Sequence, residues 1–120
     1  MPNIKVIIPA FNEADSIPFV IKDIPKLVTE IIVVSNSSTD ATEKNAKTAG
    51  ATVLTESRKG YGYACLKGLD YVARQNSKTD IIVFLDGDYS DYPEELTKLI
   101  QPILDNKVDF VIGARVKYLR

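Results

Sequence analysis

The sequence contains no histidine and no tryptophan, and it has one cysteine among 120 residues. Without histidine there is no Ser-His triad and no histidine-ligated zinc site, and the commonest general base is missing. A single cysteine excludes an internal disulfide. No apolar run approaches the roughly 18 residues of a membrane-spanning helix, and Met1–Lys5 lacks a signal-peptide pattern. We therefore expect a cytoplasmic protein.

Neither sign of charge dominates. Fifteen lysines and arginines face sixteen aspartates and glutamates, for a net charge of −1. Because there is no overall basic field, we expect no nucleic-acid partner. The length indicates one domain, and a hydrophobic content of 45% is enough for a core.

Short β-branched runs alternate with helical patterns along the chain. Such alternation is typical of an α/β fold with a mostly parallel sheet and helices on both faces, a Rossmann-like sandwich. Strands are predicted over Ile4–Pro9, Glu30–Val34, Ala51–Thr55, Thr79–Leu85 and Val108–Ile112. Helices are predicted from Ser16, from Thr39 or Asp40 to Gly50, from Tyr61 to about Gln75, and from Asp91.

Local signals place the ends and faces of these helices. Ser16 can cap the first helix, Asp40 can cap or start the second, and Gly50 is a natural stop. In the third helix Cys65, Leu69 and Val72 share a face at helical spacing, so we expect Cys65 to be an inert core thiol.

Two aspartates, Asp86 and Asp88, follow the predicted strand Thr79–Leu85 directly, separated by Gly87. Strand side chains alternate, so both carboxylates point the same way if the strand geometry persists. Like charges this close repel unless a cation lies between them. Ligand sites of open α/β sheets lie at the carboxyl ends of strands. The pair therefore predicts a site for Mg²⁺ or Mn²⁺, completed by water and substrate phosphates.

Polar residues also follow the other predicted strands, and the carboxyl ends of parallel strands meet at one sheet edge. That edge would collect carboxylates, amides, hydroxyls and two cations. Such groups, with helix N-termini, suit the base, ribose and phosphates of a nucleotide. The segments are Pro9–Glu13, Ser35–Asp40, Glu56–Gly60 and Asp86–Asp88.

Val6–Glu13, Val33–Asp40, Gly60–Gly62 and Asp86–Asp88 occur in this order. In this order they resemble the motifs of family 2 glycosyltransferases, and most closely the polyprenol-phosphate (dolichol-phosphate) mannosyl- and glucosyltransferases. Asp88–Leu96 and Val111–Arg115 support that branch. The resemblance implies a GT-A fold and metal-dependent, inverting transfer of a sugar from a UDP- or GDP-sugar to an acceptor such as a membrane polyprenyl phosphate.

The resemblance also implies roles for single residues. The base and ribose would lie against Pro9, Phe11 and Glu13, and Asn36 stands where the family often has a base-contacting aspartate. The loop that approaches the nucleotide contains Arg58 and Lys59. Asp86 would contact the ribose or the water shell of the metal, and Asp88 would ligate the metal that bridges the diphosphate.

The chain departs from the family pattern in two ways. Ser35-Asn36-Ser37-Ser38 replaces the common Asp-Asp/Asn-Gly-Ser, which leaves base selectivity open because an amide donates as well as accepts. Family members also continue into a segment that binds the acceptor and supplies later catalytic residues. We therefore expect residues 1–120 to be the N-terminal, nucleotide-sugar-binding part of a truncated GT-A domain, with no catalytic residue assigned.

Two expectations follow from the end of the sequence. An incomplete sheet leaves an edge that favours a homodimer through the last strand or helix. The basic residues Arg115, Lys117 and Arg120 either face membrane phosphates, at the inner surface of the membrane, or form a solvated tail.

Other functions fit parts of the pattern. Asp86-Gly87-Asp88 after an apolar strand is also typical of haloacid-dehalogenase-type phosphatases, which place the motif on an early strand and need a further lysine and acidic motif. An EF-hand fails because Asp91 and Thr97 occupy its glycine and glutamate positions. A nucleotide-sugar-binding module without turnover is the non-enzymatic alternative.

Overall fold

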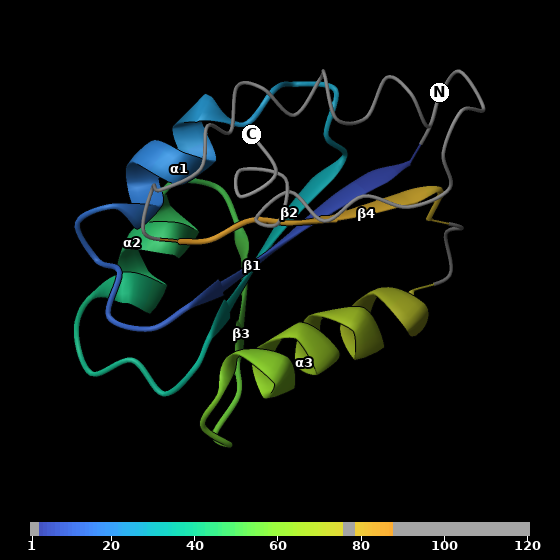
Figure 1. Ribbon diagram of the computed structural model, residues 1–120. Coiled ribbons are helices and arrows are strands. Elements are labelled where there is room, and N and C mark those ends of the chain that lie inside the picture. The colour runs from blue at the N-terminus through green and yellow to red at the C-terminus, as the bar shows by residue number, and fades with distance from the viewer. Residues whose placement is uncertain (1–2, 76–78, 88–120) are drawn as a thin grey trace, which may run out of the picture.

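The computed structural model describes residues 3–75 and 79–87 (Figure 1). Four strands form one parallel sheet in the order β3-β2-β1-β4. They are β1 (Ile4–Ala10), β2 (Glu30–Ser35), β3 (Thr52–Thr55) and β4 (Ile81–Phe84). The helices are α1 (Ile17–Asp23), α2 (Thr42–Thr48) and α3 (Tyr61–Ala73). The predicted α/β class and parallel sheet are confirmed, whereas the helix from Asp91 and the strand Val108–Ile112 lie outside the described residues.

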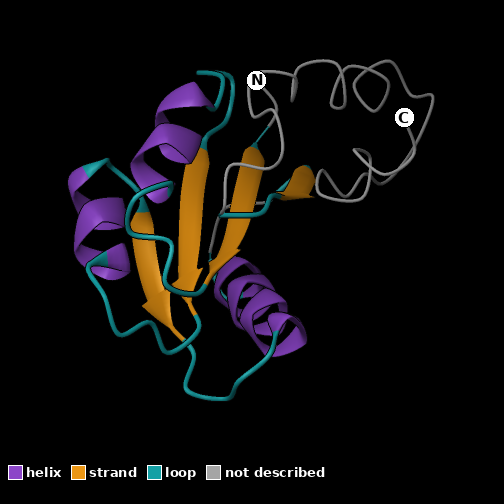
Figure 2. Cartoon of the chain, turned by 60° about the vertical axis from the view of Figure 1, so that its left-hand side comes forward, coloured by secondary structure: helices purple, strands orange, loops and turns teal. Residues whose placement is uncertain are grey.

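The sheet lies between two helical layers. Helices α1 and α2 cover one face and α3 covers the other (Figure 2). Every residue of β1 is buried, as expected of a strand covered on both faces. Its side chains alternate between the layers, so that Val6 and Ile8 pack with α1 and α2 while Ile7 packs with α3.

The line along which α3 contacts the sheet differs from the prediction by one residue. The fully buried positions are Ala64, Gly68 and Val72, while Cys65 and Leu69 are only partly buried at its side. Small residues let the helix approach the sheet closely: a Cβ added at Gly68 would lie 2.6 Å from Cγ2 of Ile7. Apolar spacing favours the larger side chains, which is why the sequence pattern was misleading. Burial raises the pKa of the Cys65 thiol, which fits an inert role.

A polar network joins α3 to the sheet where β1 and β2 begin. The carboxylate of Glu30 accepts hydrogen bonds from Lys5, Tyr71, Gln75 and Thr52 at 2.7–2.9 Å. Burial by itself would raise the pKa of Glu30, but the hydrogen bonds from Gln75, Lys5, Tyr71 and Thr52 outweigh it and lower the pKa to about 2. The network therefore holds a charged carboxylate between four elements.

The sheet order creates a crevice at the carboxyl end of β1. The chain adds β2 and β3 on one side of β1 and then crosses by α3 to place β4 on the other side. Ligands of open α/β sheets bind at such a topological switch point.

None of the helices within residues 3–75 and 79–87 has the length and apolar character that a bilayer-spanning helix needs.

Candidate functional site

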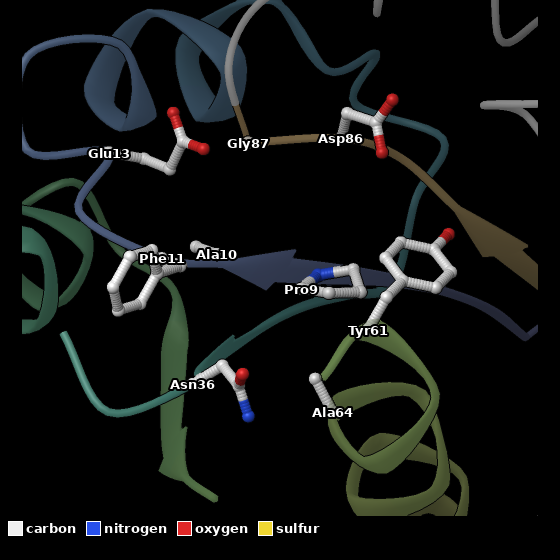
Figure 3. Close-up of a pocket in the computed structure, with 9 residues that line it drawn as sticks. All are labelled: Pro9, Ala10, Phe11, Glu13, Asn36, Tyr61, Ala64, Asp86 and Gly87. Atoms are coloured by element: carbon white, nitrogen blue, oxygen red, sulfur yellow. The ribbon is translucent and has the colours of Figure 1, made fainter. Parts of the chain in front are cut away.

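A pocket of about 270 Å³ lies at this switch point, near the lower end of the range of small-molecule sites, about 300–1,000 Å³. Figure 3 shows Glu13 and Asp86 on one side of it, Asn36 on the other, and Pro9 between them. Five of the predicted nucleotide-site residues are brought together in it. The full lining is Pro9, Ala10, Phe11, Glu13, Asn36, Tyr61, Ala64, Asp86 and Gly87.

The loop after β1 is held by the segment that precedes α2. The backbone N–H of Glu13 donates to Oγ1 of Thr42 at 2.8 Å, and that of Ala14 donates to Oδ2 of Asp40 at 3.2 Å. Asp40 also accepts the N–H and the hydroxyl of Thr42, and these bonds, the hydroxyl first, lower its pKa. Helix α2 begins at Thr42, two residues after Asp40, which therefore braces the Glu13 loop in addition to the start of the helix.

Ser16 links this loop to the end of β4. Its hydroxyl donates to the backbone carbonyl of Gly87 at 2.5 Å and lies 3.2 Å from Oε2 of Glu13. Helix α1 begins after Ser16 as predicted, but the predicted capping bond from its side chain is absent. Because the hydroxyl bonds the Gly87 carbonyl instead, Ser16 ties the Asp86-Gly87 segment to the Glu13 loop.

Gly87 is packed tightly against the same loop. A Cβ at this position would lie 3.2 Å from Cβ of Ala10, 3.3 Å from Cγ of Glu13 and 3.3 Å from Cδ1 of Ile17. The glycine between the two aspartates therefore serves close packing, with β4 and the loop after β1 in contact.

The loop that contains the predicted cations Arg58 and Lys59 is stabilised by an ion pair between Arg58 and Glu56. The guanidinium of Arg58 donates to both carboxylate oxygens of the buried Glu56 at 3.0–3.1 Å and lies 4.4 Å from the ring centroid of Tyr63. These bonds lower the pKa of Glu56 to about 2. Lys59 does not line the main pocket. It borders a neighbouring hollow with Gly60, Gly62, Tyr63 and Leu66.

The donor set fits a hard divalent cation. Asp86 and Glu13 present carboxylate oxygens to the pocket, which Mg²⁺ and Mn²⁺ prefer. Among residues 3–75 and 79–87, no three acidic, cysteine or histidine side chains form a metal cluster on their own. Asp88, the predicted direct ligand, lies outside the described part of the chain. Water and substrate phosphates would have to complete the coordination.

Sequence reasoning missed three contributions to this site. Tyr61 and Ala64 line the pocket from the first turn of α3, and Ser16 joins the two segments that carry Glu13 and Asp86. The Gly60-Tyr61-Gly62 motif marked the start of α3, but no sequence signal indicated that this turn faces the loop after β1. For Ser16 the only signal was its place before a helix, and that signal pointed to a different hydrogen bond.

The fold and the pocket together define a parallel α/β domain with a pocket at its topological switch point, and comparison with known proteins specifies its family. The family model described as Glycosyl transferase family 2 matches residues 5–120. The chain therefore belongs to glycosyltransferase family 2. This confirms the predicted membership in family 2. The phosphatase alternative, which requires the motif on an early strand, has no support because Asp86 follows the fourth strand.

Relatives and solved structures agree with this assignment. The chain is 35% identical over 116 residues to the uncharacterised protein MJ0544 of Methanocaldococcus jannaschii, covering 91% of this chain and 50% of that protein. It is 36% identical over 117 residues to protein RfbJ of Shigella flexneri, and the match covers 94% of this chain and 85% of RfbJ. A solved structure similar to this chain is glucosyl-3-phosphoglycerate synthase from Mycobacterium tuberculosis, in complex with Mn²⁺, UDP and glucosyl-3-phosphoglycerate. The two superpose with a TM-score of 0.73 at 34% identity, over 86% of this chain and 40% of the synthase. The chain thus spans about half of MJ0544 and less of the solved synthase.

Proposed function

We propose that the pocket binds the nucleoside diphosphate part of a UDP- or GDP-sugar together with Mg²⁺ or Mn²⁺, for an inverting glycosyl transfer. The observation that carries this proposal is the meeting of Glu13 and Asp86 with the end of β1 at the topological switch point of a family 2 glycosyltransferase sheet. Solved structures of the similar synthase hold UDP with Mn²⁺ or with Mg²⁺, which supports the same ligand class for this chain.

Different lining residues would contact the nucleoside and the metal-bound diphosphate of the ligand. Pro9, Phe11 and Glu13 face the pocket from the end of β1 and the following loop, and they suit the base and ribose. Asp86, with Asp88, suits the metal side. A bound divalent cation would neutralise charge on the leaving diphosphate. The tight packing of Gly87 on the Glu13 loop would hold the two sides at a fixed separation.

Calorimetric titration of the chain with UDP and GDP, with and without Mn²⁺, tests the donor site. We expect binding to be stronger with Mn²⁺ and weaker by at least about tenfold after Asp88→Ala, since a carboxylate ligand is lost. Asp70→Asn is the control, because Asp70 is exposed on α3 and pairs with Arg74 of the same surface. Equal affinity of D88A and the unaltered chain would contradict the metal role. Absence of nucleotide binding under all conditions would contradict the site.

Two acceptor classes are open for the transfer. The resemblance to polyprenol-phosphate enzymes favours a membrane polyprenyl phosphate, with the protein at the inner membrane surface. The solved synthase has a complex with UDP-glucose and phosphoglyceric acid, which favours a small phosphorylated acid. Transfer from labelled UDP-glucose and GDP-mannose to each acceptor would decide between them.

A donor-binding part without turnover is the second candidate, since the chain spans only half of MJ0544. Metal-dependent nucleotide binding combined with no transfer to either acceptor would favour it. The homodimer also stays a prediction, because the last predicted strand and helix lie beyond the described residues, and light scattering tests it.

A further inference from the structure

We propose that Asn36 is a positioning residue that clamps the backbone on both sides of Lys59, so that this cation is held ready for the bound nucleotide. The inference rests on the proposed function. It gives Asn36 a different role from the base contact that the family resemblance implies.

The clamp is visible in two hydrogen bonds of one side chain. Nδ2 of Asn36 donates to the carbonyl oxygen of Arg58 at 2.7 Å, and Oδ1 accepts the backbone N–H of Gly60 at 2.8 Å. These two atoms belong to the peptide groups immediately before and after Lys59. Asn36 is only 9% exposed, so its amide is shielded from competing water, whereas Arg58 and Gly60 belong to an exposed loop.

The clamp requires an amide. A carboxylate at position 36 could still accept from Gly60, but it could not donate to Arg58, and its charge would face a carbonyl oxygen. The reverse amide orientation would place oxygen against oxygen. Gly60 has a φ of 124°, a conformation that favours glycine, and the Asn36 bond secures that turn. The asparagine that replaces the family's aspartate is therefore the residue type that this loop conformation requires.

Of the two cations in this loop, Arg58 is paired and Lys59 is the one that can contact a bound nucleotide. Arg58 is committed to Glu56 and to the ring of Tyr63. Lys59 forms no ion pair with any residue in the described part of the chain. Ser37 also supports this loop, with its hydroxyl 3.2 Å from the carbonyl oxygen of Glu56. The backbone of this loop is thus organised before any nucleotide arrives, while the Lys59 charge is left for a ligand.

Hydrogen exchange of the nucleotide-free chain tests the clamp directly. We expect Asn36→Ala to speed exchange of the Gly60 N–H by about tenfold or more, because its acceptor is removed. Asn36→Asp keeps that acceptor and should speed it less. Asn12→Asp is the charge-matched control, since Asn12 uses its side-chain oxygen as an acceptor from Thr39. Unchanged Gly60 exchange in N36A would overturn the clamp.

Nucleotide affinity in Mn²⁺ then tests whether the clamp acts through Lys59. We expect N36A, N36D and Lys59→Ala each to weaken UDP or GDP binding by about tenfold. In the K59A chain, adding N36A should cost less than about twofold, since residues that act as a unit are not additive. Additive losses would overturn the action through Lys59, and tighter binding by N36D would favour a direct base contact. If the unaltered chain binds no nucleotide, the proposed function fails, while Gly60 exchange still decides the clamp.

Discussion

At the scale of single residues, the pocket depends on a few side chains, such as Ser16 and Asn36, that hydrogen-bond the backbone of its loops. Pro9, Phe11, Glu13, Asn36 and Asp86 share one pocket, as strand-end reasoning implies. The bonds that place them join residues far apart in the chain, such as the 71-residue separation between Ser16 and Gly87. Periodicity and motif spacing carry no information on such pairs. Lys59 borders a neighbouring hollow, and Asn36 hydrogen-bonds the backbone on both sides of it.

Ser16 supports a prediction at this scale. Ser16→Ala removes the hydroxyl that bonds the Gly87 carbonyl, so the Asp86-Gly87 segment loses a tie to the Glu13 loop. We expect Mn²⁺-dependent UDP or GDP binding to weaken by about threefold to tenfold. The melting temperature should change little, because the Ser16 side chain does not cap α1.

The Ser16→Thr variant keeps a hydroxyl and should restore most of the affinity, as measured by the same calorimetric titration. A loss of binding in S16T as large as in S16A would assign the effect to packing and contradict a role for the hydrogen bond.

At the scale of elements, the sequence pattern predicted the four strands and three helices of the described residues, and most of their ends to within about two residues. Strand β1 extends one residue further than predicted, to Ala10, and α2 is shorter at both ends. The face of α3 was harder to predict, since helical spacing selects Cys65 and Leu69 whereas close packing selects Ala64 and Gly68. Small residues give little hydrophobic signal even where they form the tightest contact.

Gly68 and Gly62 make this contact testable within one helix. Glycine to alanine in a helix normally stabilises by up to about 1 kcal/mol. At Gly68 the new methyl group would lie 2.6 Å from the buried Ile7, so we expect Gly68→Ala to destabilise by about 1–3 kcal/mol through overpacking. At Gly62 no atom lies within 4 Å, so Gly62→Ala should be neutral or stabilising.

Urea unfolding of both variants measures the difference. A Gly68→Ala chain as stable as Gly62→Ala would show that α3 can move away from β1 at no cost, and the close approach would then have no energetic role.

At the scale of the whole molecule, the alternation of strands and helices was enough to predict a parallel sheet with helices on both faces. The strand order was not predictable from that alternation, yet it creates the crevice between β1 and β4. The ion pair between the buried Lys5 and the half-buried Glu30 was missed as well. The two residues lie in separate predicted strands, and the further partners of Glu30 come from β3 and α3.

This network gives the folded chain a specific response to acid. The pKa of Glu30 is about 2 in the folded state against an ordinary value of 4.5. A carboxyl group with a lowered folded pKa contributes stability that is full above its unfolded pKa and is lost as pH falls toward the folded one. The contribution of Glu30 is therefore complete above about pH 4.5 and declines between pH 4.5 and pH 2.

Glu30→Gln isolates this contribution, because the amide is neutral at every pH. At pH 7 we expect the variant to be less stable by about 1–2 kcal/mol, less than the full shift implies because solvent partly screens the carboxylate. Urea unfolding of both chains from pH 7 to pH 2.5 should show the difference narrowing only below about pH 4.5. Glu56 also has a pKa of about 2 and titrates in the same window, but it is present in both chains and cancels in the comparison. A difference that stays constant to pH 2.5 would mean that the charge of Glu30 does not stabilise the fold.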